Sequence, residues 1–370
     1  MTNHHFDTIT PTLLMGPGPS CVPPEVYAAL SRFTIGHLDP RFIAIMDDIK
    51  DNLKTLMQTE NRLTIPISGT GSAGMETCFV NLVEPGDRVL ILRNGVFGMR
   101  MTDLATRLGA QVDILEFEWG TPVVVADVKK QLDQAQYKIV AVVHAETSTG
   151  VMNPVAEIGA LVKATDALYL VDTVTSLGGI PVKMDDWAVD AMYSGTQKCL
   201  SCPPGLAPVS FSDQAVSVLT SRKAPVPNWY LDLNMIVQYW EGASRAYHHT
   251  APINMLYGLY AALGCILKEG MQAAFDRHAS AHALLVSGLE ALGLSMAVAP
   301  ECRLPMLNAV TIPDGADDAQ IRSRLLNQFD IEIGAGLGPL AGKIWRIGLM
   351  GHTARPENVD RLLAALKELL

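Results

Sequence analysis

The sequence predicts an α/β protein, with a large domain built on a mainly parallel sheet and a smaller C-terminal α/β domain. Three observations lead to this prediction: short β-branched runs, amphipathic stretches between them, and a restart of the pattern near residue 270. A length of 370 residues accommodates about two domains, and 49% hydrophobic residues supply a large core. We expect an N-terminal arm over residues 1–15, a large domain over 16–268 and a small domain over 269–370.

Buried strands and covering helices alternate through the first half of the chain. The runs that are apolar on both faces are RLTIPI (62–67), RVLILR (88–93), KIVAVVHA (138–145) and ALYLVD (167–172). Helical spacing appears in SAGMETCFVNLV (72–83), GMRMTDLATRLGA (98–110) and VAEIGALVKATD (155–166). This alternation predicts parallel strands with helices on both faces of the sheet.

The pattern restarts toward the C-terminus. The expected elements are a helix near 272–292, the strand LNAVTIP (307–313), a helix near 317–328, the strands FDIEIG (329–334) and KIWRIGLM (343–350), and a terminal helix from Pro356. A second α/β unit follows from this order.

The composition argues against several classes of protein. The formal net charge of −10 disfavours a surface for nucleic acid or anionic lipid. No window approaches the roughly 18 apolar residues of a membrane span, and the start MTNHHFDTITP lacks the apolar core of a signal peptide. We therefore expect a cytoplasmic protein with small-molecule partners, no nucleic acid and no membrane.

The cysteines and histidines do not form a recognisable metal or disulfide pattern. Six cysteines in 370 residues are no disulfide framework. Cys199 and Cys202 form a C-x-x-C, yet no second such pair accompanies them and prolines follow directly. His248 and His249 are adjacent and point different ways, without an evident third ligand. We expect no metal site.

The stretch GTGSAG (69–74) follows a predicted strand and opens a predicted helix. Its G-x-G-x-x-G spacing lets backbone N–H groups approach a phosphate at the positive end of a helix. A dinucleotide site also needs an acidic residue about 20 positions on, where this chain has Arg93 and Asn94. The motif therefore favours phosphate binding over NAD, with a ligand-free tight turn as the alternative.

Two further residues complete a pattern. Asp172 ends an apolar strand, where an open α/β sheet places its ligand crevice, although an N-cap role is the alternative. Lys198, in YSGTQKCLSCPPG (193–205), is the only charged residue between Asp190 and Asp213. Pyridoxal phosphate (PLP) needs a helix N-terminus for its phosphate, an Asp for its ring nitrogen and a lysine for a Schiff base. Together these features predict a PLP enzyme.

These motifs resemble those of the class V, fold type I, PLP-dependent aminotransferases, in particular the alanine–glyoxylate and serine–pyruvate group. The resemblance runs from LLMGPGPSCVPPEV (13–26) to RIGLMGHTARPENVDRLL (346–363), and includes HAETSTGVMNP, LVDTVTSLGG and YHHTAPINMLYGL. It implies a homodimer with shared active sites and ping-pong amino transfer from alanine or serine to glyoxylate or pyruvate.

The resemblance also assigns residues. Lys198 would carry the Schiff base, Asp172 would pair with the ring nitrogen, Val174 and Phe97 would cover the two ring faces, and Thr147 would bond near the ring oxygen. Mammalian relatives have tryptophan in place of Phe97. The phosphate would be held by Thr70, Gly71, Ser72 and Gln197, with Tyr247 and Thr250 from the partner subunit. Gly36, His37 and Arg346 would bind substrate.

Arg346 can also be argued from the sequence itself. An arginine inside the apolar run KIWRIG is costly unless it meets an anion, and its fork matches a carboxylate. A structural salt bridge is the alternative.

Three other activities remain open at this level. (S)-Ureidoglycine–glyoxylate aminotransferases share several stretches, but carry Asn before HHT and Gln after the early IG, where this chain has Tyr247 and His37. A cysteine desulfurase would have to use Cys302, which lies between prolines. An NAD-dependent dehydrogenase lacks its ribose-binding acid.

Overall fold

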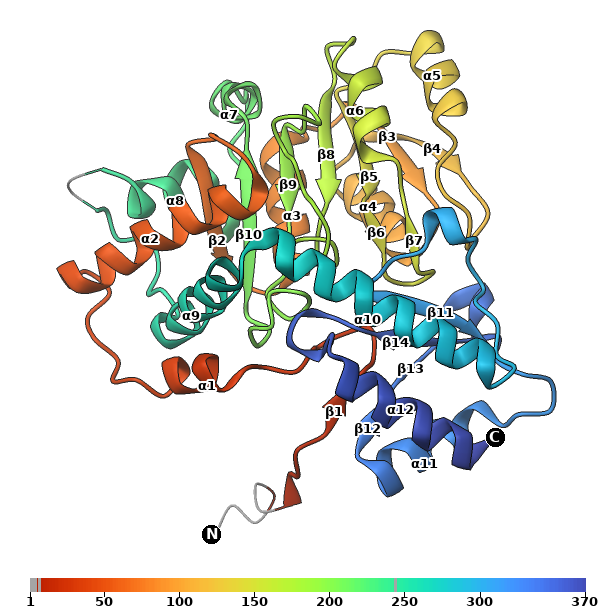
Figure 1. Cartoon of the computed structure of the whole chain (residues 1–370). Coiled ribbons are helices and arrows are strands. Elements are labelled where there is room, and N and C mark those ends of the chain that lie inside the picture. The colour runs from red at the N-terminus through yellow and green to blue at the C-terminus, as the bar shows by residue number, and fades with distance from the viewer. Residues whose placement is uncertain (1–4, 6–7, 243–244) are drawn as a thin grey trace.

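A parallel sheet with one reversed strand forms the centre of the larger part of the molecule (Figure 1). The computed structural model describes residues 5, 8–242 and 245–370. Within these residues the sheet has seven strands in the order β2-β10-β9-β8-β5-β3-β4. Their bounds are β2 (Leu63–Ser68), β10 (Leu206–Phe211), β9 (Ala191–Tyr193), β8 (Leu168–Asp172), β5 (Ile139–Val143), β3 (Arg88–Arg93) and β4 (Gln111–Glu116). Strand β10 runs antiparallel to both its neighbours, and the other pairs are parallel.

Helices pack on both faces of this sheet or against the helices that do so. They are α1 (Pro24–Leu30), α2 (Pro40–Met57), α3 (Gly71–Leu82), α4 (Val96–Arg107), α5 (Val125–Gln134), α6 (Val155–Val162), α7 (Asp213–Thr220), α8 (Leu233–Trp240) and α9 (Ile253–Glu269). In Figure 1, α3 and α4 lie behind the strands and α6 lies in front of them. Every residue of β5 and β8 is buried as a result, which explains their continuous apolar sequences.

The C-terminal part is a second α/β unit, reached through α10 (Met271–Ala291). Its antiparallel sheet has the order β11-β14-β13, formed by β11 (Leu307–Thr311), β14 (Ile344–Gly348) and β13 (Gly334–Ala335). Helices α11 (Asp318–Phe329) and α12 (Pro356–Leu369) complete it. The predicted α/β fold with a mainly parallel central sheet is therefore confirmed.

The N-terminal segment joins the C-terminal unit. Strand β1 (Leu13–Leu14) pairs in parallel with β12 (Ile331–Glu332), and the Gly348 N–H donates to Met15 O at 2.7 Å. Leu13 and Met15 belong to the same hydrophobic cluster as Trp345, apart from the large cluster around the central sheet. The predicted division at residues 15 and 268 remains a prediction.

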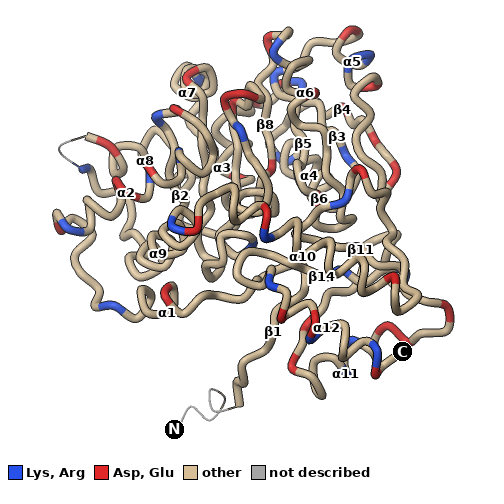
Figure 2. Tube along the Cα trace, in the orientation of Figure 1, with Lys and Arg blue, Asp and Glu red and all other residues tan. Residues whose placement is uncertain are grey.

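Two short hairpin strands, β6 (Ala145–Glu146) and β7 (Val151–Met152), follow β5 and carry the HAETSTG loop. Acidic and basic residues are interspersed over the outer helices and loops (Figure 2). Within the part of the chain that the structure describes, no helix has the length and apolar character needed to cross a membrane.

Candidate active site

A cavity of about 160 Å³ lies at the carboxyl ends of the parallel strands. It is lined by Thr70, Gly71, Ser72, Met75, Phe97, Arg100, Asp172, Val174, Tyr193, Gln197 and Lys198. Three of these, Met75, Arg100 and Tyr193, were not predicted from the sequence. The others come from four separate segments, and the parallel sheet brings them together because its strands end at one edge.

The GTGSAG loop forms one wall of this cavity. Thr70 is the residue before α3, and the helix begins at Gly71, so the first N–H groups of α3 face outward without helical partners. A side chain at Gly71 would meet Val174 at 3.3 Å, and one at Gly195 would meet Gln197 Oε1 at 2.8 Å. The two glycines thus keep open a narrow cradle at a positive helix end. Gln197 Oε1 is buried there and lacks a hydrogen-bond partner among the described residues.

Asp172 lies at the end of β8, buried in the cavity wall. Its Oδ1 accepts from the Val174 N–H at 2.8 Å, and its Oδ2 accepts from the Tyr193 hydroxyl at 2.7 Å. Burial raises the pKa of Asp172 to about 6, while the hydrogen bonds and the charge of Lys198 oppose this rise. A nearby positive ring nitrogen would favour the charged form.

Lys198 follows β9 and points into the same cavity, with 7% of its surface exposed. Burial lowers its pKa to about 8, and the charges of Arg346 and Arg100 act in the same direction. Its Nζ donates to the carbonyl of Pro17, and Gly18, at φ 107°, lies directly against the lysine side chain. Burial thus increases the neutral, nucleophilic fraction of this amine.

Arg346 connects the C-terminal unit to the site. It lies on β14, is 7% exposed, and donates from Nε to Ala335 O at 2.7 Å and from Nη1 to Thr147 O at 3.3 Å. Burial lowers its pKa, and the charge of Glu146 opposes this. Among the described residues Arg346 has hydrogen bonds to carbonyls only, so its charge is not neutralised by a direct ion pair. The neighbouring Thr147 hydroxyl bonds to that of Thr175 at 2.5 Å.

Six predicted residues do not line this cavity of their own chain. Two of them are Arg346 and Thr147, which bond to each other, and the other four are Gly36, His37, Tyr247 and Thr250. The rings of His37 and Tyr247 are 5.3 Å apart, and the Tyr247 hydroxyl lies 3.3 Å from Thr250 Oγ1. Gly36 is exposed, and Tyr247 is 60% exposed. This separate cluster leaves the cross-subunit assignment a prediction.

The two histidines beside this cluster have other partners. His248 stacks on Trp229 with ring centroids 4.4 Å apart, and His249 Nε2 lies 2.8 Å from Ser68 Oγ.

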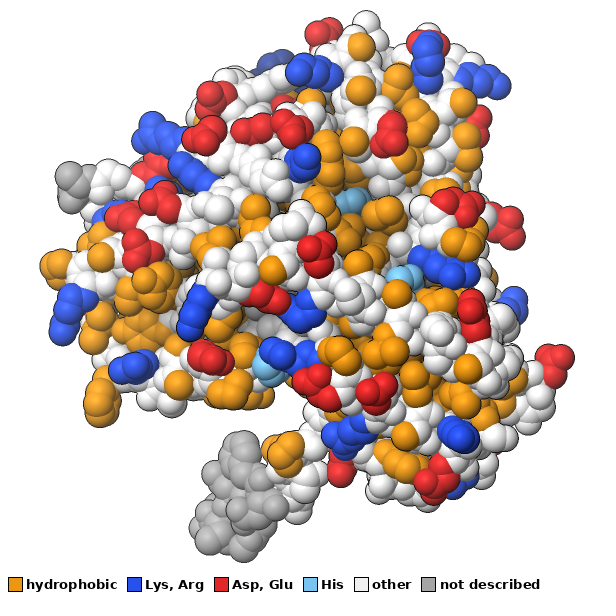
Figure 3. Space-filling model, in the orientation of Figure 1, with side chains coloured by type: hydrophobic (Ala, Val, Ile, Leu, Met, Phe, Trp, Pro, Cys, Tyr) orange, Lys and Arg blue, Asp and Glu red, His pale blue; other side chains and the backbone are white. Residues whose placement is uncertain are grey.

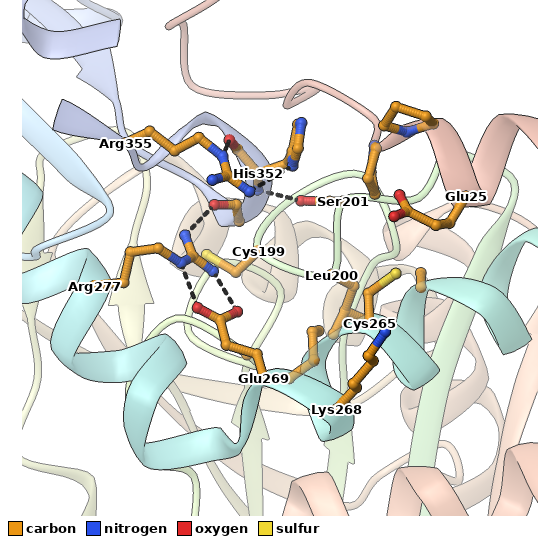
Figure 4. Close-up of a pocket in the computed structure, with 16 residues that line it drawn as sticks. Glu25, Cys199, Leu200, Ser201, Cys265, Lys268, Glu269, Arg277, His352 and Arg355 are labelled. Atoms are coloured by element: carbon orange, nitrogen blue, oxygen red, sulfur yellow. Dashed lines mark hydrogen bonds and ion pairs between the residues drawn. The ribbon is translucent and has the colours of Figure 1, made fainter. Parts of the chain in front are cut away.

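A larger cavity of about 460 Å³ is lined in part by Cys199, Leu200 and Ser201 (Figure 4). These three residues belong to the segment 193–205 that carries Lys198, which we call the lysine loop. The Arg277–Glu269 ion pair crosses it at 2.6 Å, and Arg277 also donates to Gly351 O at 2.6 Å. The His352 N–H donates to Ser201 Oγ at 2.7 Å, which anchors the lysine loop from behind. Lys198 and Asp172 do not line this cavity, so its side chains support the site without forming it.

The cysteines that the sequence singled out are buried thiols. Cys199 and Cys202 are unpaired, and Cys199 Sγ donates to Thr175 O at 3.2 Å. Cys302 lies in a small apolar cluster with Val298 and Ala309.

Fold and site together have the features expected of a PLP-dependent enzyme, and the comparison with protein families identifies its class. The family model described as Aminotransferase class-V matches residues 12–362, so the chain belongs to the class V aminotransferases. This family implies PLP as the cofactor. Relatives at 41–42% identity are named as aminotransferases, which favours amino transfer over the desulfurase and dehydrogenase alternatives. A cysteine desulfurase structure at 16% identity and a TM-score of 0.76 shares the fold alone.

Relatives of similar identity carry two different names. The chain is 41% identical to the (S)-ureidoglycine–glyoxylate transaminase of Bacillus subtilis, over 96% of this chain and 90% of that protein. It is 42% identical to the alanine–glyoxylate aminotransferase of Rattus norvegicus, over 98% and 88%. The crystal structure of an alanine–glyoxylate aminotransferase from Nostoc sp. superimposes with a TM-score of 0.96 at 46% identity, covering 100% of this chain and 99% of that chain.

Proposed function

We propose that this aminotransferase moves the amino group of alanine or serine to glyoxylate or pyruvate, using PLP in a ping-pong reaction. The observation that carries the proposal is the meeting of the GTGSAG helix start, Asp172 and Lys198 in one cavity. These three contacts match the phosphate, the ring nitrogen and the aldehyde of PLP.

The residues present fit this cofactor. The Gly71–Gly195 cradle leaves room for a phosphate at the start of α3, whose free N–H groups can donate to it. Thr70, Gly71, Ser72 and Gln197 would hold the phosphate. PLP supplies an aldehyde and an electron-withdrawing pyridinium ring.

Further residues in and beside the cavity would orient the cofactor ring and control its protonation. Asp172 would keep the proton on the ring nitrogen by its charge, with Tyr193 and the Val174 N–H fixing the carboxylate. Val174 and Phe97 would cover the two ring faces, and Thr147 would bond near the ring oxygen. Lys198 would supply the amine that holds the cofactor aldehyde and would move the substrate Cα proton, a role that its lowered pKa favours.

Arg346 would bind the α-carboxylate of donor and acceptor. Its charge lacks a direct ion pair among the described residues, and its planar fork matches a carboxylate in two parallel hydrogen bonds.

We also propose a homodimer in which Tyr247 and Thr250 reach the phosphate of the partner, and Gly36 and His37 its substrate. Large apolar side chains are exposed in the segment that precedes Gly36: Phe33 is 96% exposed and Tyr27 60%. Hydrophobic side chains gather over α1, α2 and α9 on the left of the face in Figure 3. Exposed patches of this kind are typical of interfaces.

A second donor, (S)-ureidoglycine, is kept because the Bacillus subtilis relative carries that activity in its name at similar identity. Tyr247 matches the alanine–glyoxylate type rather than the Asn of the ureidoglycine enzymes, whereas His37 matches neither type. The preference for the smaller donors therefore rests on Tyr247. Cytoplasmic location stays part of the proposal, supported by six cysteines that all remain free thiols.

A half-reaction panel tests the substrate. Enzyme loaded with PLP is mixed with one amino donor at a time while the visible absorption of the bound cofactor is followed. Alanine or serine should abolish the band fastest, and glyoxylate should restore it. A response to (S)-ureidoglycine alone would select the second candidate, and no response to any of the three would contradict the proposal.

A further inference from the structure

The start of helix α4 is capped by residues from another segment. Gly95 precedes the helix and has no side chain with which to cap it. Instead, the Val96 N–H donates to Ser148 Oγ at 2.9 Å. The next residue, Phe97, lines the cavity beside Asp172. The first turn of α4 is therefore held by the HAETSTG loop.

Glu146 stands behind this contact. Its Oε1 accepts from the Ser148 hydroxyl at 2.5 Å and from the Ser148 N–H at 3.1 Å. The N–H of Gly98, also in the first turn of α4, approaches the carboxylate and helps to stabilise its charge. Any side chain at Gly95 would collide with Glu146, so the glycine, the carboxylate and the helix start are fitted to one another.

Burying the carboxylate of Glu146 costs free energy, so we expect this side chain to have a role beyond packing. Glu146 is fully buried, its Oε2 has no hydrogen-bond partner among the described residues, and burial raises its pKa to about 7. The charge of Asp172 also disfavours the carboxylate, while Arg346 attracts it. The positive end of α4 offsets part of the cost. A neutral acceptor would cap the helix without this burial cost, so the carboxylate is more than packing requires.

We propose that Glu146 is a positioning residue which, through Ser148 and the first turn of α4, holds Phe97 at the face of the cofactor ring. The proposal rests on the proposed binding of PLP in this cavity. Glu146 touches neither the reacting atoms nor the substrate carboxylate site; it acts through the backbone of Val96 and Gly98.

The test is a double-mutant cycle on cofactor affinity. The dissociation constant of PLP is measured by titrating the apoenzymes of wild type, Glu146→Ala, Phe97→Leu and the double variant. Glu146→Ala leaves the capping hydroxyl of Ser148 in place but removes the carboxylate that orients it. A loss comparable to one helix cap, about 1 kcal/mol, should weaken PLP binding roughly fivefold. In the Phe97→Leu background the same change should cost less than about twofold, because coupled residues are not additive.

A second readout does not involve the cofactor. Hydrogen exchange of the apoenzyme should speed up at the Val96–Gly98 amides in Glu146→Ala, and exchange in the strands of the central sheet should stay as in wild type. Ser148→Ala, which removes the hydroxyl acceptor, should change both readouts in the same direction. Glu157→Gln, an exposed acid on α6, is the matched control and should change neither.

The possible outcomes distinguish a failure of the positioning role from a failure of the proposed function. Additive effects of Glu146→Ala and Phe97→Leu, or unchanged PLP affinity in a folded Glu146→Ala, would overturn the positioning role. If Glu146→Ala does not fold, the cycle of Ser148→Ala with Phe97→Leu decides by the same criterion. Absence of PLP binding in the wild type would instead contradict the proposed function, while the exchange data still report on the cap.

Discussion

The Tyr193 hydroxyl donates a 2.7 Å hydrogen bond to Oδ2 of Asp172 inside the candidate site. The two residues pair directly across the neighbouring strands β8 and β9. Because the strands are parallel, both side chains stand at the carboxyl edge of the sheet. Tyr193 therefore fixes the orientation of the acid that we assign to the ring nitrogen.

Replacing Asp172 by Asn should separate cofactor binding from turnover. The variant should retain cofactor but lose most turnover, roughly a hundredfold or more, because an amide cannot hold the ring proton by charge. Tyr193→Phe keeps the acid and should lose only roughly tenfold, the cost of about one hydrogen bond. Steady-state turnover of cofactor-saturated enzyme measures both. Near wild-type turnover of the Asn variant would make Asp172 a structural residue.

The same substitution has a pH signature in the apoenzyme. Burial raises the pKa of Asp172 to about 6, so the folded state disfavours its charge and loses stability as the pH rises from about 4 to about 6. Asp172→Asn removes this loss and should be more stable above pH 6, by up to about 3 kcal/mol. Urea unfolding at pH 5 and pH 7.5 measures the difference. Equal stability of the two apoenzymes at pH 7.5 would mean that burial does not disfavour the charged form of Asp172.

Cofactor association should follow the ionisation of Lys198. Its pKa is lowered to about 8, and only the neutral amine attacks an aldehyde. The association rate should rise roughly fivefold between pH 7 and 8, and less than twofold between pH 8 and 9. Stopped-flow absorbance of apoenzyme mixed with PLP records the profile. A rate that keeps rising tenfold per pH unit to pH 10 would contradict a desolvated lysine.

Arg346→Ala should weaken substrate binding and spare the cofactor. Losing a desolvated charge pair costs about 2–5 kcal/mol, or roughly 30-fold or more in the apparent constants for alanine and glyoxylate. Arg346→Lys should recover little, because one ammonium cannot make the paired contact. Lys343→Ala, an exposed cation on the same segment, is the control. If the Ala variant loses its cofactor or unfolds, Arg346 is structural, through its bonds to Ala335 and Thr147.

Subunit mixing tests the shared site. Lys198→Ala is mixed with Tyr247→Phe/Thr250→Ala under conditions that exchange subunits. Heterodimers should contain one site with both defects and one intact site, so activity should return to roughly a quarter of wild type. Each variant incubated alone is the control. No recovery in a mixture shown to contain heterodimers would place Tyr247 and Thr250 at their own subunit's site.

Part of the fold followed directly from sequence patterns. RVLILR coincides with β3, and ALYLVD contains β8, because strands buried on both faces must be apolar throughout. Strand β10 was not predicted, since LAPVSF contains Pro208. The ladder tolerates this proline because β9 ends at Tyr193 and the opposing Pro66 lies on the edge strand β2.

The residues of the site also fall into those that the sequence could predict and those that it could not. Asp172, Lys198 and the GTGSAG loop could be predicted because each carries a chemical signal in its own segment. Arg100, Met75 and the Pro17 carbonyl at Lys198 could not, because their place depends on how separate segments pack. Tyr193 could have been predicted from the sequence, because it directly precedes the SGTQK motif.

The central claim, a PLP Schiff base on Lys198, is tested most directly by borohydride reduction of the loaded enzyme followed by peptide mapping. The pyridoxyl label should appear on the peptide containing Lys198 and be absent from folded Lys198→Ala, which should also have no transaminase activity. A label on any other lysine of the wild type, or an active Lys198→Ala, would contradict the account.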